Sequence, residues 1–109
     1  MSVTLGETTP RHAVEEVFGL DQLADAMLTL RTRDELKRFL RDLCTLRELE
    51  ALAHRWQIVR LLDQGLPYLE IAERVHTSTA TVTRVAWWLR HGAGGYALAL
   101  ERTRPEHEP

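Results

Sequence analysis

Apolar residues along this chain return every three or four positions, which is the spacing of one face of an α-helix. A strand-like alternation of apolar and polar residues never persists, so we expect an all-helical protein. Two stripes of this kind contain Leu20, Leu23, Ala24, Met27 and Leu28, and then Leu36, Phe39, Leu40 and Leu43. A longer stripe contains Leu49, Leu52, Ala53, Trp56, Ile58, Val59, Leu61 and Leu62.

Helix boundaries can be predicted for the first two stripes. The first helix is expected to open near Gly19 or Asp21 and to close around Arg31. Residues 32–35, Thr-Arg-Asp-Glu, then have the spacing of a capping box, in which the threonine hydroxyl accepts from the glutamate N–H and the glutamate reaches back. A second helix is expected to follow this box.

The third stripe predicts a long helix that contacts a second subunit. Residues 45–48, Thr-Leu-Arg-Glu, repeat the capping box, and the helix is expected to run to about Gln64, where Gly65 allows a left-handed stop. Its apolar residues cover more than one face. In so short a chain, a helix that is apolar on two sides favours a homodimer.

Residues 68–87, YLEIAERVHTSTATVTRVAW, have the pattern of a helix-turn-helix. The first helix is expected to end at Val75, residues 76–78 to form the turn, and the second helix to run from Thr79 to about Arg90. Such a unit needs apolar side chains in the angle between its two crossing helices and a small residue where they approach. Those residues are Ile71, Ala72, Val75, Val82 and Val85.

The turn carries two local predictions. Ser78 has the side chain of an N-cap. His76 occupies the turn position where glycine is common because a positive φ is needed, and histidine tolerates that conformation better than most residues.

The opposite face of the second helix is predicted to contact DNA. Short side chains let a helix lie deep in the major groove, and an arginine can pair with guanine O6 and N7. The predicted DNA-binding residues are Ser78, Thr79, Ala80, Thr83 and Arg84, with Thr81 at the margin. An alternative interpretation is that the two helices form an interaction module that docks onto a protein, such as part of the transcription machinery.

Composition adds little beyond the class of protein. The chain has 109 residues and a formal net charge of -2, but residues 31–104 carry thirteen basic and nine acidic groups. Of the fourteen basic residues thirteen are arginine, which suits phosphate and guanine recognition and equally suits ion pairs between subunits. As an indication of nucleic-acid binding this is weak.

The remaining sequence features favour one cytoplasmic domain. Residues 1–13 are expected to form a flexible arm, residues 14–102 the helical domain, and residues 103–109 a flexible tail. Cys44 is the only cysteine, so a disulfide within the chain is excluded and a reducing compartment is expected. No apolar run is long enough to span a membrane, and the N-terminus lacks the order of a secretory signal.

No catalytic or metal site can be assembled by spacing. The sequence has no glycine-rich loop after a strand and no nucleophile with a nearby base. Its five histidines lack the i, i+3 or i, i+4 pairing that places two ligands on one helical face. We therefore expect no enzyme activity, no cofactor and no bound metal.

From about Leu43 to Leu89 the chain resembles the Trp repressor superfamily, and most closely its YerC/YecD branch. Members of that branch are similarly short and end with a glycine-rich element followed by an aromatic residue, which residues 91–96 match here. The resemblance rests on Thr45, the Glu-Ala-Leu run at 50–52, Arg55, Ile58, Val59, Gly65 and the Thr-Val-Thr-Arg run at 81–84.

The resemblance implies an intertwined, all-helical homodimer with about six helices per chain, in which two reading heads meet adjacent major grooves of double-stranded DNA. The operator would be palindromic, with half-sites about 34 to 36 Å apart. The function implied is that of a sequence-specific transcriptional regulator of the repressor type.

In the tryptophan-sensing members, the corepressor lies between two arginines, which Arg55 and Arg84 match, and meets a threonine, which Thr45 matches. The small residues beside the reading helix are replaced here by Val85 and Trp88. We therefore expect no tryptophan response, with Trp88 filling part of the pocket; whether another small molecule binds there is left open.

Overall fold

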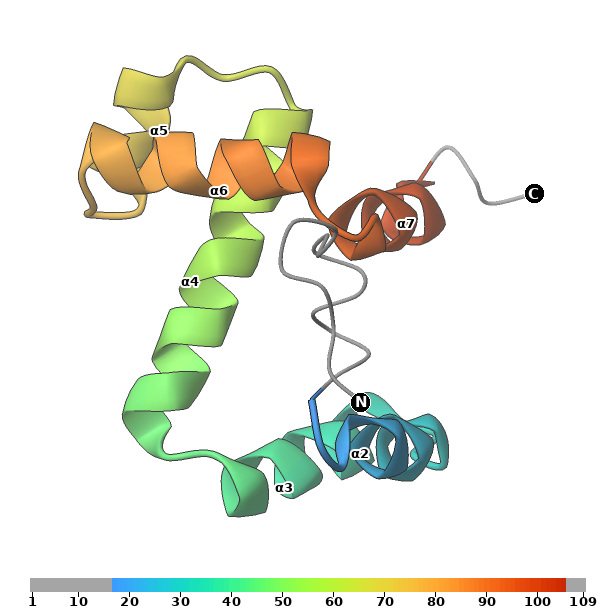
Figure 1. The fold of residues 1–109 in the computed structure, drawn as a ribbon. Coiled ribbons are helices and arrows are strands. Elements are labelled where there is room, and N and C mark those ends of the chain that lie inside the picture. The colour runs from blue at the N-terminus through green and yellow to red at the C-terminus, as the bar shows by residue number, and fades with distance from the viewer. Residues whose placement is uncertain (1–16, 106–109) are drawn as a thin grey trace. The chain divides into compact units, whose positions relative to one another are not determined.

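The protein is described by a computed structural model that places residues 17–105. Contacts within the chain divide it into two compact units, whose described parts are residues 17–50 and 51–105. The described residues form six helices and no strand, which confirms the all-helical prediction (Figure 1). The helices are α2 (Leu20–Leu28), α3 (Arg33–Leu43), α4 (Leu46–Asp63), α5 (Tyr68–Arg74), α6 (Thr79–His91) and α7 (Gly95–Thr103).

The predicted ends of the domain lie mostly outside the described residues. This holds for the expected arm at 1–13, for residues 14–16 of the expected domain, and for residues 106–109 of the expected tail. The domain boundaries therefore stay predictions.

The first unit contains α2 and α3, joined by a short connection. Helix α2 begins after Gly19 and ends at Leu28, before the predicted end at Arg31. It stops there because Thr29 closes the last turn: its N–H donates to backbone carbonyls of that turn, and its hydroxyl donates to the Ala26 carbonyl at 2.6 Å.

The capping box predicted for α3 forms with one difference. Thr32 is the N-cap, and its hydroxyl accepts from the Glu35 N–H at 3.1 Å. The Glu35 carboxylate, however, accepts from the Arg31 N–H at 2.8 Å, one residue before the expected partner. The glutamate therefore reaches back as predicted, one position further than the N–H of the N-cap residue.

Both ends of α4 follow the sequence prediction. At the start, the Thr45 hydroxyl accepts from the Glu48 N–H at 3.1 Å, and the Thr45 N–H donates to the Glu48 carboxylate at 2.8 Å. At the end, Gly65 has a φ of 86°. The Gly65 N–H donates to the Leu62 carbonyl and the Leu66 N–H to the Leu61 carbonyl, which is the Schellman arrangement.

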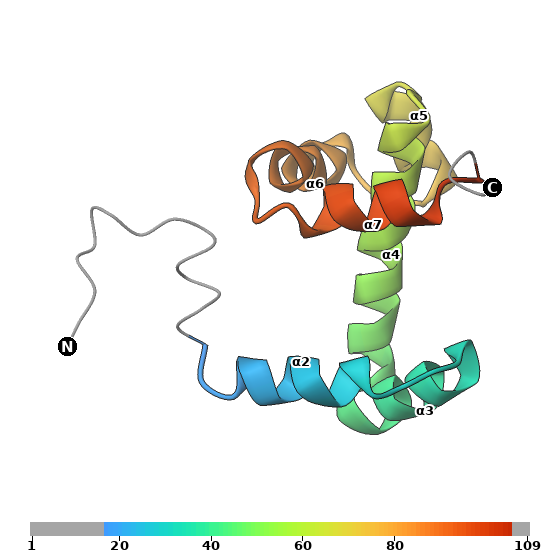
Figure 2. The ribbon, with the colours of Figure 1, turned by 90° about the vertical axis from the view of Figure 1, so that its right-hand side faces the viewer.

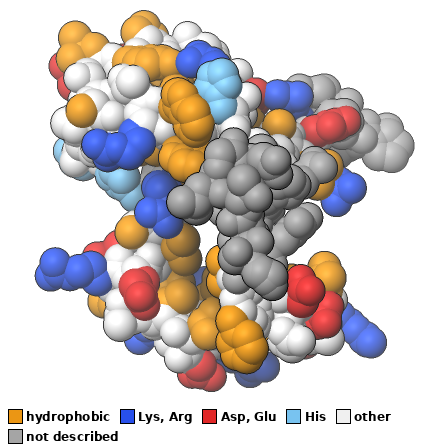
Figure 3. Space-filling view, viewed as in Figure 1, with side chains coloured by type: hydrophobic (Ala, Val, Ile, Leu, Met, Phe, Trp, Pro, Cys, Tyr) orange, Lys and Arg blue, Asp and Glu red, His pale blue; other side chains and the backbone are white. Residues whose placement is uncertain are grey.

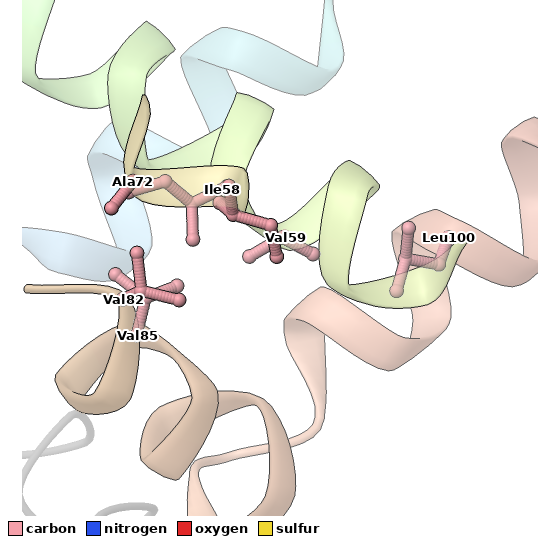
Figure 4. Close-up of a cluster of buried hydrophobic side chains, with 7 residues drawn as sticks. Ile58, Val59, Ala72, Val82, Val85 and Leu100 are labelled. Carbon is pink, nitrogen blue, oxygen red and sulfur yellow. The ribbon is translucent and has the colours of Figure 1, made fainter. Parts of the chain in front are cut away.

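The second unit has a hydrophobic core built from four helices. Its buried side chains point toward one another from the last turns of α4 and from α5, α6 and α7 (Figure 4). They are Ile58, Val59, Ile71, Ala72, Val82, Val85 and Leu100. Trp56 and Tyr96 pack against this core from its edge, with ring centroids 6.3 Å apart. A short turn containing Gly92 and Gly94 joins α6 to α7 (Figure 2).

The first unit, by contrast, has no core of its own in the described chain. Neither α2 nor α3 contains a buried residue. Leu28 is 81% exposed, Leu43 51% and Leu46 59%. Hydrophobic side chains accordingly lie at the surface among charged ones in the lower part of Figure 3. None of the helices in residues 17–105 has the length and hydrophobicity needed to cross a membrane.

Candidate nucleic-acid interface

The helix-turn-helix predicted from the sequence is formed by α5 and α6. Helix α5 has Pro67 at its N-cap, and its exposed side is tied by an ion pair between Glu70 and Arg74 at 2.7 Å. Its inner side buries Ile71 and Ala72. These two side chains pack against buried residues of α6. Because a protein core is closely packed, this contact restricts the angle at which α6 crosses α5.

The turn between the two helices has the predicted conformation. His76 has a φ of 59°, and it is the non-glycine residue with positive φ among residues 17–105. This left-handed residue reverses the chain so that the Thr77 N–H donates to the Ala72 carbonyl at 2.9 Å. The prediction of a positive φ at His76 is confirmed.

Helix α6 begins at a serine cap, as predicted. The Ser78 hydroxyl accepts from the Thr81 N–H at 3.1 Å and lies 3.1 Å from the Thr81 hydroxyl. Val82 and Val85 point into the core and are almost fully buried. Helix α6 is therefore fixed at its start and along its inner side, which leaves its outer side free to meet a partner.

The predicted DNA-binding residues lie on that outer side. Ser78, Thr79, Ala80, Thr83 and Arg84 are all exposed, whereas Thr81 is partly buried at the margin. The Thr83 hydroxyl donates to the Thr79 carbonyl at 2.9 Å, so its hydrogen is already used and its oxygen can act toward a ligand only as an acceptor. Within the described residues Arg84 has no ion pair or hydrogen bond, so its guanidinium is available to a ligand.

The charge of α6 also favours an anionic partner. The helix contains no aspartate or glutamate, and it carries Arg84, Arg90 and His91. The ion pairs found within residues 51–105 join Arg74 to Glu70 and Arg104 to Asp63, and neither involves α6. A helix with arginines and no carboxylates suits the negatively charged surface of a nucleic acid.

Beside α6 lies a pocket of about 480 Å³. Four of the five residues predicted for an effector pocket line it, namely Arg55, Arg84, Val85 and Trp88. The fifth, Thr45, belongs to the first unit and caps α4; it is not among the lining residues. Trp88 forms part of the wall of this space. The expectation that it takes up part of a ligand's room stays a prediction.

Sequence reasoning missed other members of this pocket. Ala51, His54, Thr81 and Tyr96 complete the lining. His54 directly precedes Arg55, and Tyr96 is the aromatic residue that follows the glycine-rich turn. Their role depends on how α4, α6 and α7 pack, which spacing along the chain does not reveal.

Within residues 17–105, no three His, Cys, Asp or Glu side chains gather closely enough to hold a metal ion. A shifted carboxyl group is found at Asp63, where the hydrogen bond from Arg104 lowers the pKa; burial opposes this effect, and the positive charge of the guanidinium adds to it. This ion pair joins α4 to the end of α7 and serves the fold.

Comparison with known proteins identifies the family. The family model described as Trp repressor protein matches residues 18–104. YerC of Bacillus subtilis (strain 168), an uncharacterised protein, is 40% identical over 85 residues, which span 78% of this chain and 82% of YerC.

Two solved structures are also similar. The first, a TrpR-like protein from Eubacterium eligens ATCC 27750, is 37% identical with a TM-score of 0.74, and the match covers 80% of this chain and 90% of that one. The second, from Staphylococcus aureus and described as a candidate Trp repressor, is 38% identical with a TM-score of 0.75, over 82% and 91% of the two chains. The chain therefore belongs to the Trp repressor family, whose members are regulators and not enzymes.

Proposed function

We propose that the protein is a sequence-specific DNA-binding transcriptional regulator that acts as a homodimer on a palindromic operator. The observation that carries the proposal is the outer face of α6. It presents short side chains and Arg84, which has no ion pair within residues 17–105, on a helix without carboxylates, and the buried Val82 and Val85 hold that helix in place.

The chemistry of this face fits the major groove. The Arg84 guanidinium can donate two hydrogen bonds to guanine O6 and N7, which distinguishes a G·C pair from the others. The outward methyl groups of Ala80 and Thr83 suit a thymine methyl, and the Thr83 oxygen can accept from a base amino group. Phosphates alongside would fix the register of α6 without adding sequence information.

The homodimer is supported by the first unit. Helices α2 and α3 bury no residue, although leucines with exposed fractions from 51% to 81% lie on or next to them. Apolar surface of this kind is stabilised when a second copy covers it, at roughly 25 cal/mol for each Å² removed from water. A two-fold dimer presents two α6 helices, so its operator would be palindromic, with half-sites about 34 to 36 Å apart.

DNA binding can be tested with purified protein and a site obtained by selection from random or genomic duplexes. Affinity for the selected duplex should fall with log salt at a slope near -0.9 for each phosphate contacted. An apolar docking surface for a protein partner would respond little to salt. Failure to select any duplex, or an affinity indifferent to salt, would favour the alternative function of a protein-interaction module.

A matched pair of arginine variants tests the role of α6. Arg84→Ala should weaken binding to the selected duplex by about 5- to 150-fold if the guanidinium reads a base. Arg102→Ala removes the same charge from an exposed position on α7 and should change affinity by less than about threefold, as a change in net charge alone. Equal losses for the two variants would contradict base reading by Arg84.

We further propose that the protein does not respond to tryptophan. Val85 and Trp88 stand where small residues make room beside the reading helix in tryptophan-sensing members, and here Trp88 forms part of the pocket wall. Calorimetry with L-tryptophan should show no micromolar binding. Micromolar binding that also tightens DNA affinity would overturn this proposal and would make Arg55 and Arg84 the first residues to test, followed by Thr45 in a dimer.

A further inference from the structure

A tryptophan lies in the middle of the outer face of α6. Trp87 follows Thr83 by four residues and Arg84 by three, so its side chain leaves the helix between theirs. It is 48% exposed, although tryptophan is among the residues that gain most from burial. If α6 enters the major groove by this face, Trp87 must meet the DNA as well.

The Trp87 ring is held in place by neighbours on its own helix. The Trp88 ring lies edge-on to it, with centroids 5.0 Å apart and an interplanar angle of 81°. The His91 ring also contacts it, with centroids 4.9 Å apart and an interplanar angle of 42°. A side chain already fixed in this way loses little conformational entropy when a partner binds it.

The side chains that precede and follow Trp87 on α6 are basic or neutral. Arg84 precedes it by one turn, Arg90 and His91 follow, and α6 has no carboxylate. Such a surface repels a basic partner and suits an anionic one that also offers apolar area. The sugar-phosphate backbone of DNA has both properties.

We propose that Trp87 contacts the deoxyribose-phosphate backbone at the rim of the major groove. Its indole N–H would donate to a phosphate oxygen and its ring would pack against a sugar, while the His91 ring packs against the indole. The short side chains at the start of α6 then reach the bases, and Trp87 sets how far the later turns of the helix can enter. The inference rests on the proposed function, since it assumes that α6 lies in the groove by this face.

Because backbone contacts carry no sequence information, Trp87 should affect all duplexes alike. Trp87→Ala is expected to weaken binding by about tenfold or more, on the selected duplex and on a scrambled one. Trp87→Phe keeps most of the ring and removes the N–H, so it should lose about 2- to 12-fold. Leu98→Ala removes an apolar side chain of similar exposure, 46%, on α7 and should leave affinity within about twofold.

The same titrations separate this inference from the proposed function. If Arg84→Ala loses affinity while Trp87→Ala and Trp87→Phe bind like the unaltered protein, the function stands and the Trp87 contact is refuted. If the unaltered protein binds no duplex, the function itself is refuted. A loss confined to the selected duplex would also overturn the inference, because it would indicate base reading.

Sedimentation of each variant completes the test. We expect Trp87→Ala and Trp87→Phe to keep the mass of the unaltered protein and its helical circular dichroism. A Trp87 variant that dissociates the assembly would place this side chain in contact with a second copy of the chain, and the proposed backbone contact would be wrong.

Discussion

Arg104 forms a two-pronged ion pair with Asp63, which lies 41 residues earlier in the chain. The Arg104 Nε donates to Oδ2 at 3.1 Å, and Nη2 donates to Oδ1. The pair joins the residue after α7 to the last residue of α4, so it fixes the C-terminal helix of the second unit against the helix that carries Ile58 and Val59. An arginine that binds a carboxylate through two hydrogen bonds forms a stronger and geometrically more specific contact than one that binds through a single hydrogen bond.

This pair predicts a dependence of stability on acid. The hydrogen bond and charge of Arg104 lower the pKa of Asp63 in the folded protein. The contribution is therefore fully present above the unfolded pKa of about 4 and is lost as the pH falls through the lower, folded value. Asp63→Asn should reduce the free energy of unfolding at pH 7 by about 0.2 to 1 kcal/mol, given the partial exposure of the pair. Urea titrations at pH 7 and near pH 2.5 measure it, at one fixed protein concentration.

A control distinguishes the pair from a general loss of charge. Glu101→Gln removes a carboxylate from α7 that has no ion pair in the described part of the chain. It should change stability at pH 7 by less than Asp63→Asn does. A destabilisation by Asp63→Asn that persists undiminished in acid would show that its cause is not the charged pair.

The turn of the helix-turn-helix predicts a stabilising substitution. His76 holds a φ of 59°, which costs a residue with a Cβ about 1 to 2 kcal/mol. Glycine removes that cost but gives the unfolded chain more freedom, worth about 0.5 to 1 kcal/mol. His76→Gly should therefore raise the free energy of unfolding by up to about 1.5 kcal/mol, measured by urea denaturation.

The same position offers a variant of opposite sign. Valine is branched at Cβ and resists the left-handed conformation, so His76→Val should destabilise the fold by about 1 kcal/mol or more. A His76→Gly protein less stable than the unaltered one would mean that the imidazole makes a favourable interaction that outweighs the strain.

Trp88 approaches Gly92 so closely that no larger residue fits there without a shift. A Cβ at Gly92 would lie 2.5 Å from the Trp88 carbonyl oxygen and 3.2 Å from the Trp88 ring. Gly92→Ala must therefore displace the end of α6, and we expect a loss of about 1 to 3 kcal/mol. Near-ultraviolet circular dichroism and tryptophan emission should change with it, because the ring borders the pocket beside α6.

Gly95, three residues after Gly92, provides the control for that substitution. A Cβ at Gly95 would meet nothing within 4 Å, and Gly95 is the first residue of α7. Gly95→Ala should be neutral or stabilise by up to about 1 kcal/mol, since alanine favours a helix. Equal losses from both alanines would contradict the specific clash with Trp88.

The parts of the structure that sequence predicted are those set by neighbouring residues. The cap at Thr45, the stop at Gly65, the turn at His76 and the cap at Ser78 each depend on side chains within a few positions. Local hydrogen bonds and backbone preferences determine such features, and both depend on residues only a few positions apart in the sequence. The exposed face of α6 follows from them, because burying Val82 and Val85 turns Thr83 and Arg84 outward.

The parts that sequence missed depend on distant packing. Three such features depend on how separate helices meet. They are the Asp63–Arg104 pair, the place of Tyr96 in the pocket wall and the open space beside Trp88. A pattern of spacings cannot say which helix ends meet, since many arrangements bury the same apolar stripes. The Glu35 bond to Arg31 shows that the partner in a predicted cap is known only to within one residue, because a long side chain can accept from either of two adjacent N–H groups.

In the proposed homodimer, the leucines that α2 and α3 leave uncovered would make this protein sensitive to its own abundance. A chain that completes its fold with a second copy gains stability by mass action as more of it accumulates. Scarce copies spend longer incompletely folded, and proteases remove such chains first. Cellular dosage would then govern both the amount of regulator and its lifetime, so that halving its synthesis lowers the active pool by more than half.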